Sequence, residues 1–139
     1  EGGSQGGAAA LHMAAVDPAV ALCMADVPSA CWWEHRVMQR AGAGSGIASF
    51  IRAHPDKLDD VMTTLSYYDN LNHAANIRCP VLISCGLKDP VCPPEGIYAV
   101  YNKITAPKQM IAYPFAEHEG GAARHLEPKM RFLRRHFNI

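Results

Sequence analysis

GGSQG, at residues 2–6, matches the pattern G-x-S-x-G, and a run of small, helix-compatible residues follows it at residues 8–15. In this pattern the serine stands on a sharp turn between a strand and a helix, where its hydroxyl is exposed. Small neighbours avoid clashes in the turn, and small residues in the helix let it pack closely on a sheet. The pattern therefore predicts a reactive serine at Ser4, although a glycine-rich stretch alone would also fit a flexible terminus.

Two apolar runs have the length of buried strands, namely AVALCMADV at 19–27 and PVLISCG at 80–86, and KQMIAYPF at 108–115 is predicted as a third strand. Apolar residues at helical spacing predict helices after Pro55, over 94–104 and over the last segment, in which Leu126, Met130, Leu133 and Phe137 form one stripe. AGAGSG, at 41–46, is expected to form a flexible loop. Because strands alternate with helices, the sequence predicts an α/β fold with a mostly parallel sheet flanked by helices.

The charge balance gives no reason to expect nucleic-acid or membrane binding. The 139 residues include 13 Lys+Arg and 13 Asp+Glu, so the formal net charge is zero. No run approaches the roughly 20 apolar residues of a membrane span. The five cysteines form no CxxC pair, which predicts buried free thiols and a cytoplasmic location. The histidines show no HxxxH spacing, so we expect neither a metal site nor a cofactor.

A reactive serine needs a histidine as base and a carboxylate that orients it. In α/β-hydrolases these residues follow in the order serine, acid, histidine, and each stands just past a strand. Asp89 follows the run at 80–86, and His118 follows the run at 108–115. Asp26 is a competing acid because it also ends a strand-like run. We prefer Asp89, since it lies in a tight turn directly after its strand.

The remaining candidates have weaker signals. The other six histidines are expected to be exposed or partly packed, because each lies in a helix or before the acid. Trp32 and Trp33 are weak candidates for substrate binding, since aromatic faces suit an acyl or sugar pocket, and core packing fits them equally well. Cys85 and Cys92 are expected to pack rather than react, and the arginines of the last segment are expected to face solvent. The backbone N–H of Gln5, directly after Ser4, is a candidate oxyanion donor.

Several longer motifs go beyond a fold pattern: GGSQGG, SYYDNLNHA, PVLISCGLKDPVCPP, YAVYNK and YPFAEHEGG. In this order they resemble the acetyl xylan esterase / cephalosporin-C deacetylase family. The resemblance implies an α/β-hydrolase that deacetylates small esters, acetylated xylo-oligosaccharides and cephalosporin C, commonly as a metal-free homohexamer. It implies that Ser4 is the nucleophile, Asp89 the acid, His118 the base and Gln5 one oxyanion donor. The family's second donor, a tyrosine N–H, lies in an N-terminal half outside this sequence.

We therefore interpret residues 1–139 as the C-terminal portion of a single α/β-hydrolase domain that begins at the serine turn, without the N-terminal strands. Such a fragment is expected to be poorly active alone. The sequence leaves open a different α/β-hydrolase, similar to dienelactone hydrolases or acyl-peptide hydrolases. It also leaves open a non-catalytic, hydrolase-like interaction module.

Overall fold

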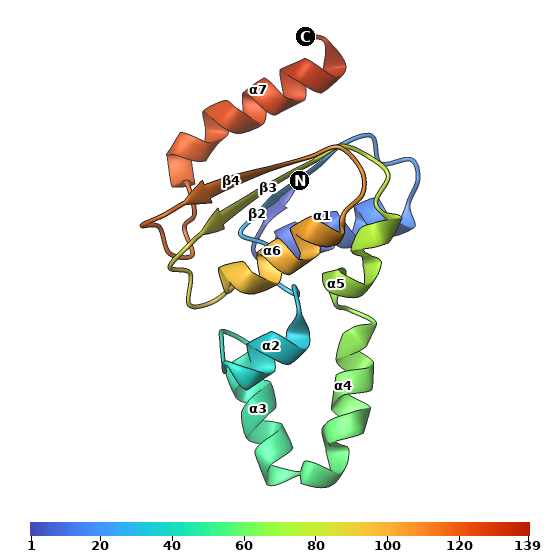
Figure 1. Ribbon diagram of the computed structural model, residues 1–139, viewed down its shortest axis with the longest axis vertical. Coiled ribbons are helices and arrows are strands. Elements are labelled where there is room, and N and C mark those ends of the chain that lie inside the picture. Colours follow the sequence, from blue (N-terminus) through green and yellow to red (C-terminus); the bar gives the residue numbers. More distant parts are fainter.

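Four parallel strands form a single sheet in the order β1-β2-β3-β4 (Figure 1). The computed structural model describes all residues from 1 to 139. The strands are β1 (Gly2–Gly3), β2 (Cys23–Asp26), β3 (Val81–Gly86) and β4 (Lys108–Tyr113). The two residues of β1 pair with the last two residues of β2, so a short strand does precede Ser4.

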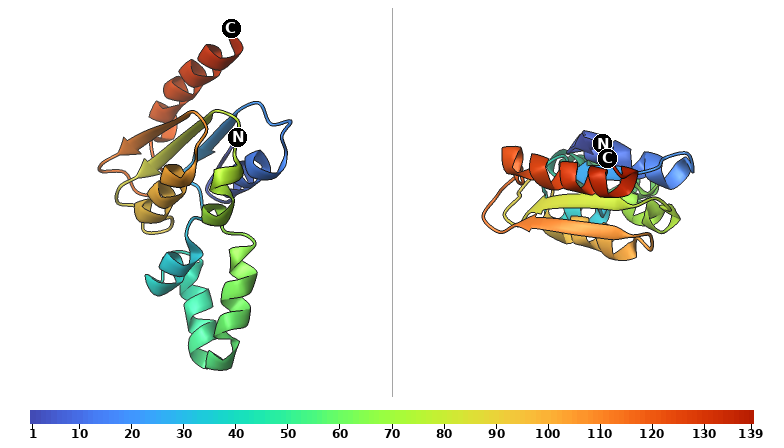
Figure 2. Two further views of the ribbon diagram at one scale, coloured as in Figure 1. Left: turned by 45° about the vertical axis from the view of Figure 1, so that its right-hand side comes forward. Right: turned by 90° about the horizontal axis from the view of Figure 1, so that it is seen from above.

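Helices lie on both sides of this sheet. The α-helices are α1 (Gln5–Val16), α2 (Trp33–Met38), α3 (Gly44–Ala53), α4 (Leu58–Ser66), α5 (Asn70–His73), α6 (Pro94–Lys103) and α7 (Leu126–Phe137). Short 3-10 helices occur at η1 (Pro55–Lys57), η2 (Ala74–Asn76) and η3 (Ala122–His125). Helices α1, α5 and α6 lie together on one side of the sheet, and α7 lies on the other (Figures 1 and 2). This arrangement confirms the predicted α/β fold.

The core lies between the sheet and the helices α1 and α6. All six residues of β3 are buried, as expected for a central parallel strand with covered faces. Leu11 of α1 and Ile97 and Val100 of α6 pack against this strand and are fully buried. Both helices are thereby fixed relative to the strand ends. No helix of the chain combines the length and the apolar character that a membrane crossing requires.

The sequence prediction was wrong for the loop expected at residues 41–46, whereas the helix predicted after Pro55 is confirmed as α4. The glycine-rich residues 41–46 are not a loop throughout, because α3 begins at Gly44. Helices α2, α3 and α4 project away from the sheet as an arm (Figure 1). The apolar run at 19–27 is also only partly a strand, since β2 spans four residues. A short strand suffices there because its neighbours β1 and β3 supply the pairing partners.

The carboxyl ends of the parallel strands meet at one edge of the sheet, where the ligand sites of open α/β folds occur. Ser4 directly follows β1, Asp89 follows β3 and His118 follows β4. A side chain at Gly86 would lie 2.6 Å from the carbonyl oxygen of Ala116, so the end of β3 and the loop before His118 are in close contact. The sheet therefore places all three candidate residues at the same edge.

Candidate active site

Ser4 occupies a strained turn between β1 and α1. Its φ is 53° and its ψ is −114°, a backbone conformation that a non-glycine residue adopts only when its surroundings impose it. The Ser4 N–H donates to the carbonyl oxygen of Asp26 at 2.8 Å, and the Ser4 carbonyl oxygen accepts from the N–H groups of Ala8 and Ser29, each at 3.0 Å. A Cβ at Gly2 would lie 2.9 Å from the Cα of Gly6, so this turn requires glycine. These contacts hold the Ser4 hydroxyl outside the helix.

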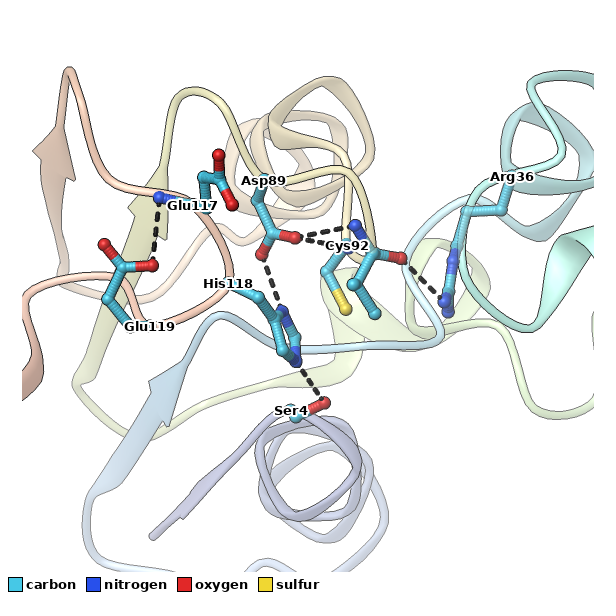
Figure 3. A network of polar contacts seen from close by, with 8 residues as sticks. Ser4, Arg36, Asp89, Cys92, Glu117, His118 and Glu119 are labelled. Atoms are coloured by element: carbon cyan, nitrogen blue, oxygen red, sulfur yellow. Dashed lines mark hydrogen bonds and ion pairs between the residues drawn. The ribbon is translucent and has the colours of Figure 1, made fainter.

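A chain of hydrogen bonds connects Ser4, His118 and Asp89 (Figure 3). Nε2 of His118 lies 3.0 Å from Oγ of Ser4, and Nδ1 of His118 lies 2.8 Å from Oδ2 of Asp89. A carboxylate only accepts, so Nδ1 carries the proton that is donated to Asp89. Nε2 is therefore free to accept a hydrogen bond from the serine hydroxyl. The geometry brings together the three residues that the sequence singled out.

The Asp89 carboxylate is fully buried and is held by backbone donors. Its Oδ1 accepts from the N–H of Val91 at 2.8 Å and from the N–H of Cys92 at 2.9 Å. The carbonyl oxygen of Val91 in turn accepts a hydrogen bond from Nη2 of Arg36 at 3.0 Å (Figure 3). Arg36 is only 3% exposed and has no carboxylate partner in the chain. The loop that carries the acid is therefore tied to α2 by a buried guanidinium.

A cavity of about 650 Å³ lies beside Ser4, and most of its lining residues are apolar. Gln5 lines it at the first position of α1, where the backbone N–H has no acceptor within the helix. Trp33 also lines the cavity, with the guanidinium of Arg36 4.6 Å from its ring centre. Trp32 is not part of the lining and stacks on His35 at 4.8 Å. The structure thus separates the two tryptophans, and only Trp33 adjoins the site.

The buried Asp69 fixes the turn that carries both tryptophans. Its carboxylate accepts from the backbone N–H of Trp32 at 2.8 Å and of Trp33 at 2.7 Å, and also from Leu71 at the start of α5. Trp32 has a φ of 55°, so this turn is held in a left-handed conformation. Asp69 offsets that cost through charge-assisted hydrogen bonds and positions Trp33 beside the cavity.

The five cysteines are unpaired and buried, which agrees with their prediction as packed thiols. Burial raises the pKa of the Cys92 thiol to about 11, and the nearby guanidinium of Arg36 opposes that rise only in part. Burial likewise raises the pKa of Cys85 to about 11. Both thiols are therefore protonated at neutral pH and are poor nucleophiles.

Asp26, the competing acid, belongs to a different cluster on the α7 side of the sheet. Its carboxylate lies 3.1 Å from Nε2 of His125 and accepts a hydrogen bond from Nζ of Lys129 at 2.7 Å. The Nδ1 of His125 lies 2.8 Å from the hydroxyl of Tyr113, and the histidine is 3% exposed. The expectation of an exposed or partly packed histidine is therefore wrong for His125. The Asp26 carboxylate contacts His125 and Lys129, whereas the Asp89 carboxylate contacts His118.

We expect the Asp26 cluster to stabilise the protein only above acidic pH. Burial alone would raise the pKa of Asp26, but the contacts with His125 and Lys129 outweigh it and lower the pKa below its usual value. A lowered folded-state pKa gives stability that is present above the unfolded value of about 4 and is lost as the pH falls through the folded value. Asp26→Asn should therefore lower the urea midpoint at neutral pH, with a difference from wild type that shrinks below about pH 4. A difference that stays constant with pH would contradict this role.

Nearly the whole chain matches a known protein family. The family model described as acetyl xylan esterase matches residues 1–136. This chain belongs to the acetyl xylan esterase family. A curated relative, the acetyl esterase Axe7A of Xylanibacter ruminicola, is 42% identical over 118 residues, which are 85% of this chain and 26% of that protein.

Solved structures of acetyl xylan esterases have the same fold as this family member. The enzyme from Paenibacillus sp. R4 superposes with a TM-score of 0.90 at 35% identity, covering 96% of this chain and 43% of that one. The enzyme from Thermoanaerobacterium sp. gives a TM-score of 0.87 at 31% identity, covering 98% and 44%. More distant neighbours, such as a puromycin hydrolase at 18% identity and a TM-score of 0.77, share the α/β-hydrolase fold alone. The chain thus spans a quarter to less than half of the length of these relatives.

Three buried residues of this acetyl xylan esterase family chain carry contacts that sequence reasoning missed. Arg36, Asp69 and His125 each bind groups that are far away in the sequence, up to 99 residues for His125 and Asp26. Nothing in their immediate neighbours marks them as buried. For Asp69, its place inside the SYYDNLNHA motif was the only available signal.

Proposed function

We propose that residues 1–139 supply the catalytic triad of a serine carboxylesterase that removes acetyl groups from small or carbohydrate esters. Ser4 is the nucleophile, His118 the general base and Asp89 the residue that orients the base. The observation that carries this proposal is the hydrogen-bonded chain from Ser4 Oγ through His118 to Asp89. Membership of the acetyl xylan esterase family supports the choice of acetyl esters.

In the first half of the reaction, Ser4 Oγ attacks the acetyl carbonyl carbon while His118 Nε2 takes the hydroxyl proton. Asp89 Oδ2 accepts the Nδ1–H of His118, and the buried carboxylate stabilises the imidazolium that forms. The carbonyl oxygen becomes an oxyanion. When the tetrahedral intermediate collapses, His118 gives its proton to the leaving alcohol oxygen, and Ser4 remains as an acetyl ester.

The N–H of Gln5 is one donor to this oxyanion. It lies at the N-terminus of α1, where free N–H groups and the helix dipole favour a negative charge. The family resemblance implies a second donor, a tyrosine N–H outside residues 1–139. In the second half of the reaction, His118 takes a proton from water, which attacks the acetyl group, and acetate leaves as Ser4 regains its proton.

We place the leaving group of the substrate in the cavity beside Ser4. Its volume of about 650 Å³ exceeds what an acetyl group needs, so it has room for part of a sugar or a comparable ring. Trp33 offers an aromatic surface at its wall. Acetylated xylo-oligosaccharides and cephalosporin-like esters are the substrate classes that the family resemblance implies.

We further propose that residues 1–139 are the C-terminal portion of one α/β-hydrolase domain. Their coverage of 43% and 44% of two solved acetyl xylan esterases supports this organisation. The resemblance implies a homohexamer, and the buried free thiols favour a reducing compartment such as the cytoplasm. Because these residues are proposed to be one portion of a domain, the full-length protein is the material for each activity test.

Acyl-chain selectivity tests the proposed substrate class. We expect kcat/KM of the full-length protein to be at least about tenfold higher for p-nitrophenyl acetate than for p-nitrophenyl butyrate, because an acyl site shaped for one methyl group rejects added methylenes. Aminoacyl p-nitroanilides serve as the comparison and should be cleaved poorly. A preference for aminoacyl substrates would instead favour an acyl-peptide hydrolase, and a preference for longer acyl groups would favour another esterase class.

A further inference from the structure

Cys92 has a special place among the five buried cysteines. It lies in the loop that carries Asp89, three residues after it, and its backbone N–H donates to the Asp89 carboxylate. Its side chain is 2% exposed and lines the cavity beside Ser4. Figure 3 shows its sulfur near the His118 ring, on the same side of the loop as Ser4. The hydrogen-bonded chain from Ser4 to Asp89 does not use this thiol.

Three metal-binding donors of different chemistry converge here. The sulfur of Cys92, a nitrogen of His118 and a carboxylate oxygen of Asp89 all lie within 4.8 Å of one another. In a tetrahedral zinc site, bonds of about 2.0–2.3 Å place the donors about 3.3–3.7 Å apart. Closing the site therefore needs a movement of roughly 1 Å, and the His118 side chain, which is 33% exposed, has the freedom to make it.

We propose that Cys92, His118 and Asp89 form an inhibitory binding site for a thiophilic divalent cation such as Zn²⁺. The three residues are a mixed sulfur, nitrogen and oxygen set of the kind that holds zinc while leaving a fourth position for water. The thiol releases its proton to solvent as the sulfur–metal bond forms, and the imidazole stays neutral. The thiolate and the carboxylate together balance the two positive charges of the ion, so the occupied site is neutral.

Occupation of this site stops the reaction of the proposed esterase whichever imidazole nitrogen binds the ion. A metal on Nε2 directly replaces the Ser4 hydroxyl as its partner. A metal on Nδ1 leaves the proton on Nε2, which then has no lone pair to accept the serine proton. The inference rests on the proposed function for its inhibitory effect, whereas metal binding itself depends only on the three donors.

Cobalt absorption tests binding independently of catalysis. Titrating the full-length protein with Co²⁺ should produce a thiolate-to-cobalt charge-transfer band at one ion per chain, and Zn²⁺ should displace it. In metal sites, removing a residue that only hydrogen-bonds to a ligand costs about 10–100-fold in metal affinity. Cys92 is a direct ligand in the proposed site, so Cys92→Ala should weaken Zn²⁺ binding by more than about 100-fold. Cys92→Ser, which keeps the size of the side chain but offers a harder donor, should also lose the thiolate band.

Cys85→Ala is the matched control, because Cys85 is a buried thiol of β3 outside the donor cluster, and it should bind Zn²⁺ as the wild type does. Zn²⁺ should inhibit p-nitrophenyl acetate hydrolysis by the wild type and Cys85→Ala at the same concentration, and chelation should restore activity. An active esterase without the cobalt–thiolate band would overturn the metal site. A protein that shows the band but no esterase activity keeps the metal site and overturns the proposed function.

Discussion

Ser4→Ala should lower kcat/KM of the full-length protein for p-nitrophenyl acetate by about 10⁴–10⁶-fold, which removes nearly all turnover. The hydroxyl that lies 3.0 Å from His118 Nε2 is lost, and no other side chain occupies its position on the strained turn. The fold should survive, because the turn is held by the backbone N–H and carbonyl oxygen of this residue. Steady-state kinetics and a thermal unfolding curve of the same sample measure both effects.

Covalent labelling by a fluorophosphonate probe tests the reactivity of Ser4 independently of turnover. It should form one adduct with the wild type and none with Ser4→Ala, because the probe reacts only with an activated serine. Ser66→Ala is a matched control, since Ser66 is a serine at the end of α4 whose hydroxyl donates only to the Thr63 carbonyl oxygen. An unlabelled wild-type protein would instead support a non-catalytic, hydrolase-like module.

The parts of the fold and site that the sequence predicts correctly have local signals. Strand β3 is a fully buried, largely apolar run, β4 is a partly buried run, and each candidate residue follows a strand. In a parallel sheet that position alone brings distant residues to one edge. The chain order of Ser4, Asp89 and His118 therefore contains most of the information about their arrangement.

In the arm formed by α2, α3 and α4, the sequence predicts only α4, as the helix after Pro55. The glycine-rich residues at the start of α3 favour a loop prediction. Ile47, Phe50 and Ile51 repeat at the helical spacing that would have predicted this helix. The arm contacts the site partly through buried polar groups, such as Arg36 with the Val91 carbonyl oxygen, 55 residues away. Such pairs leave no periodic pattern in the sequence, since they depend on how the arm meets the sheet.

The choice between two carboxylates shows where the structure adds to the sequence. Asp26 is the last residue of β2 and Asp89 follows β3, so both lie at a strand end, as expected for an acid. Asp26 is at ion-pair distance from His125 and Lys129, which leaves it no contact with His118. Asp89 receives two backbone hydrogen bonds on one oxygen and presents the other to His118. The partners of each carboxylate, rather than its position after a strand, distinguish them.

Asp89→Asn should lower kcat by about 10⁴-fold, because the amide no longer selects the tautomer of His118 that can accept the serine proton. An asparagine NH₂ group donates to Nδ1, which moves the imidazole proton to Nε2. The substitution keeps the size of the side chain, so KM should change far less than kcat. Kinetics with p-nitrophenyl acetate over a range of pH measure both quantities.

Asp26→Asn is the matched control for this change, because it makes the same substitution at the end of the neighbouring strand β2. It removes a negative charge beside His125 and Lys129, and so it should lower stability while most of the esterase activity remains at neutral pH. If Asp26→Asn abolished kcat and Asp89→Asn did not, the acid would be Asp26 and the assignment of Asp89 would be wrong. A loss of kcat in Asp89→Asn and a loss of stability in Asp26→Asn would instead separate the carboxylate that orients the base from the one that stabilises the fold.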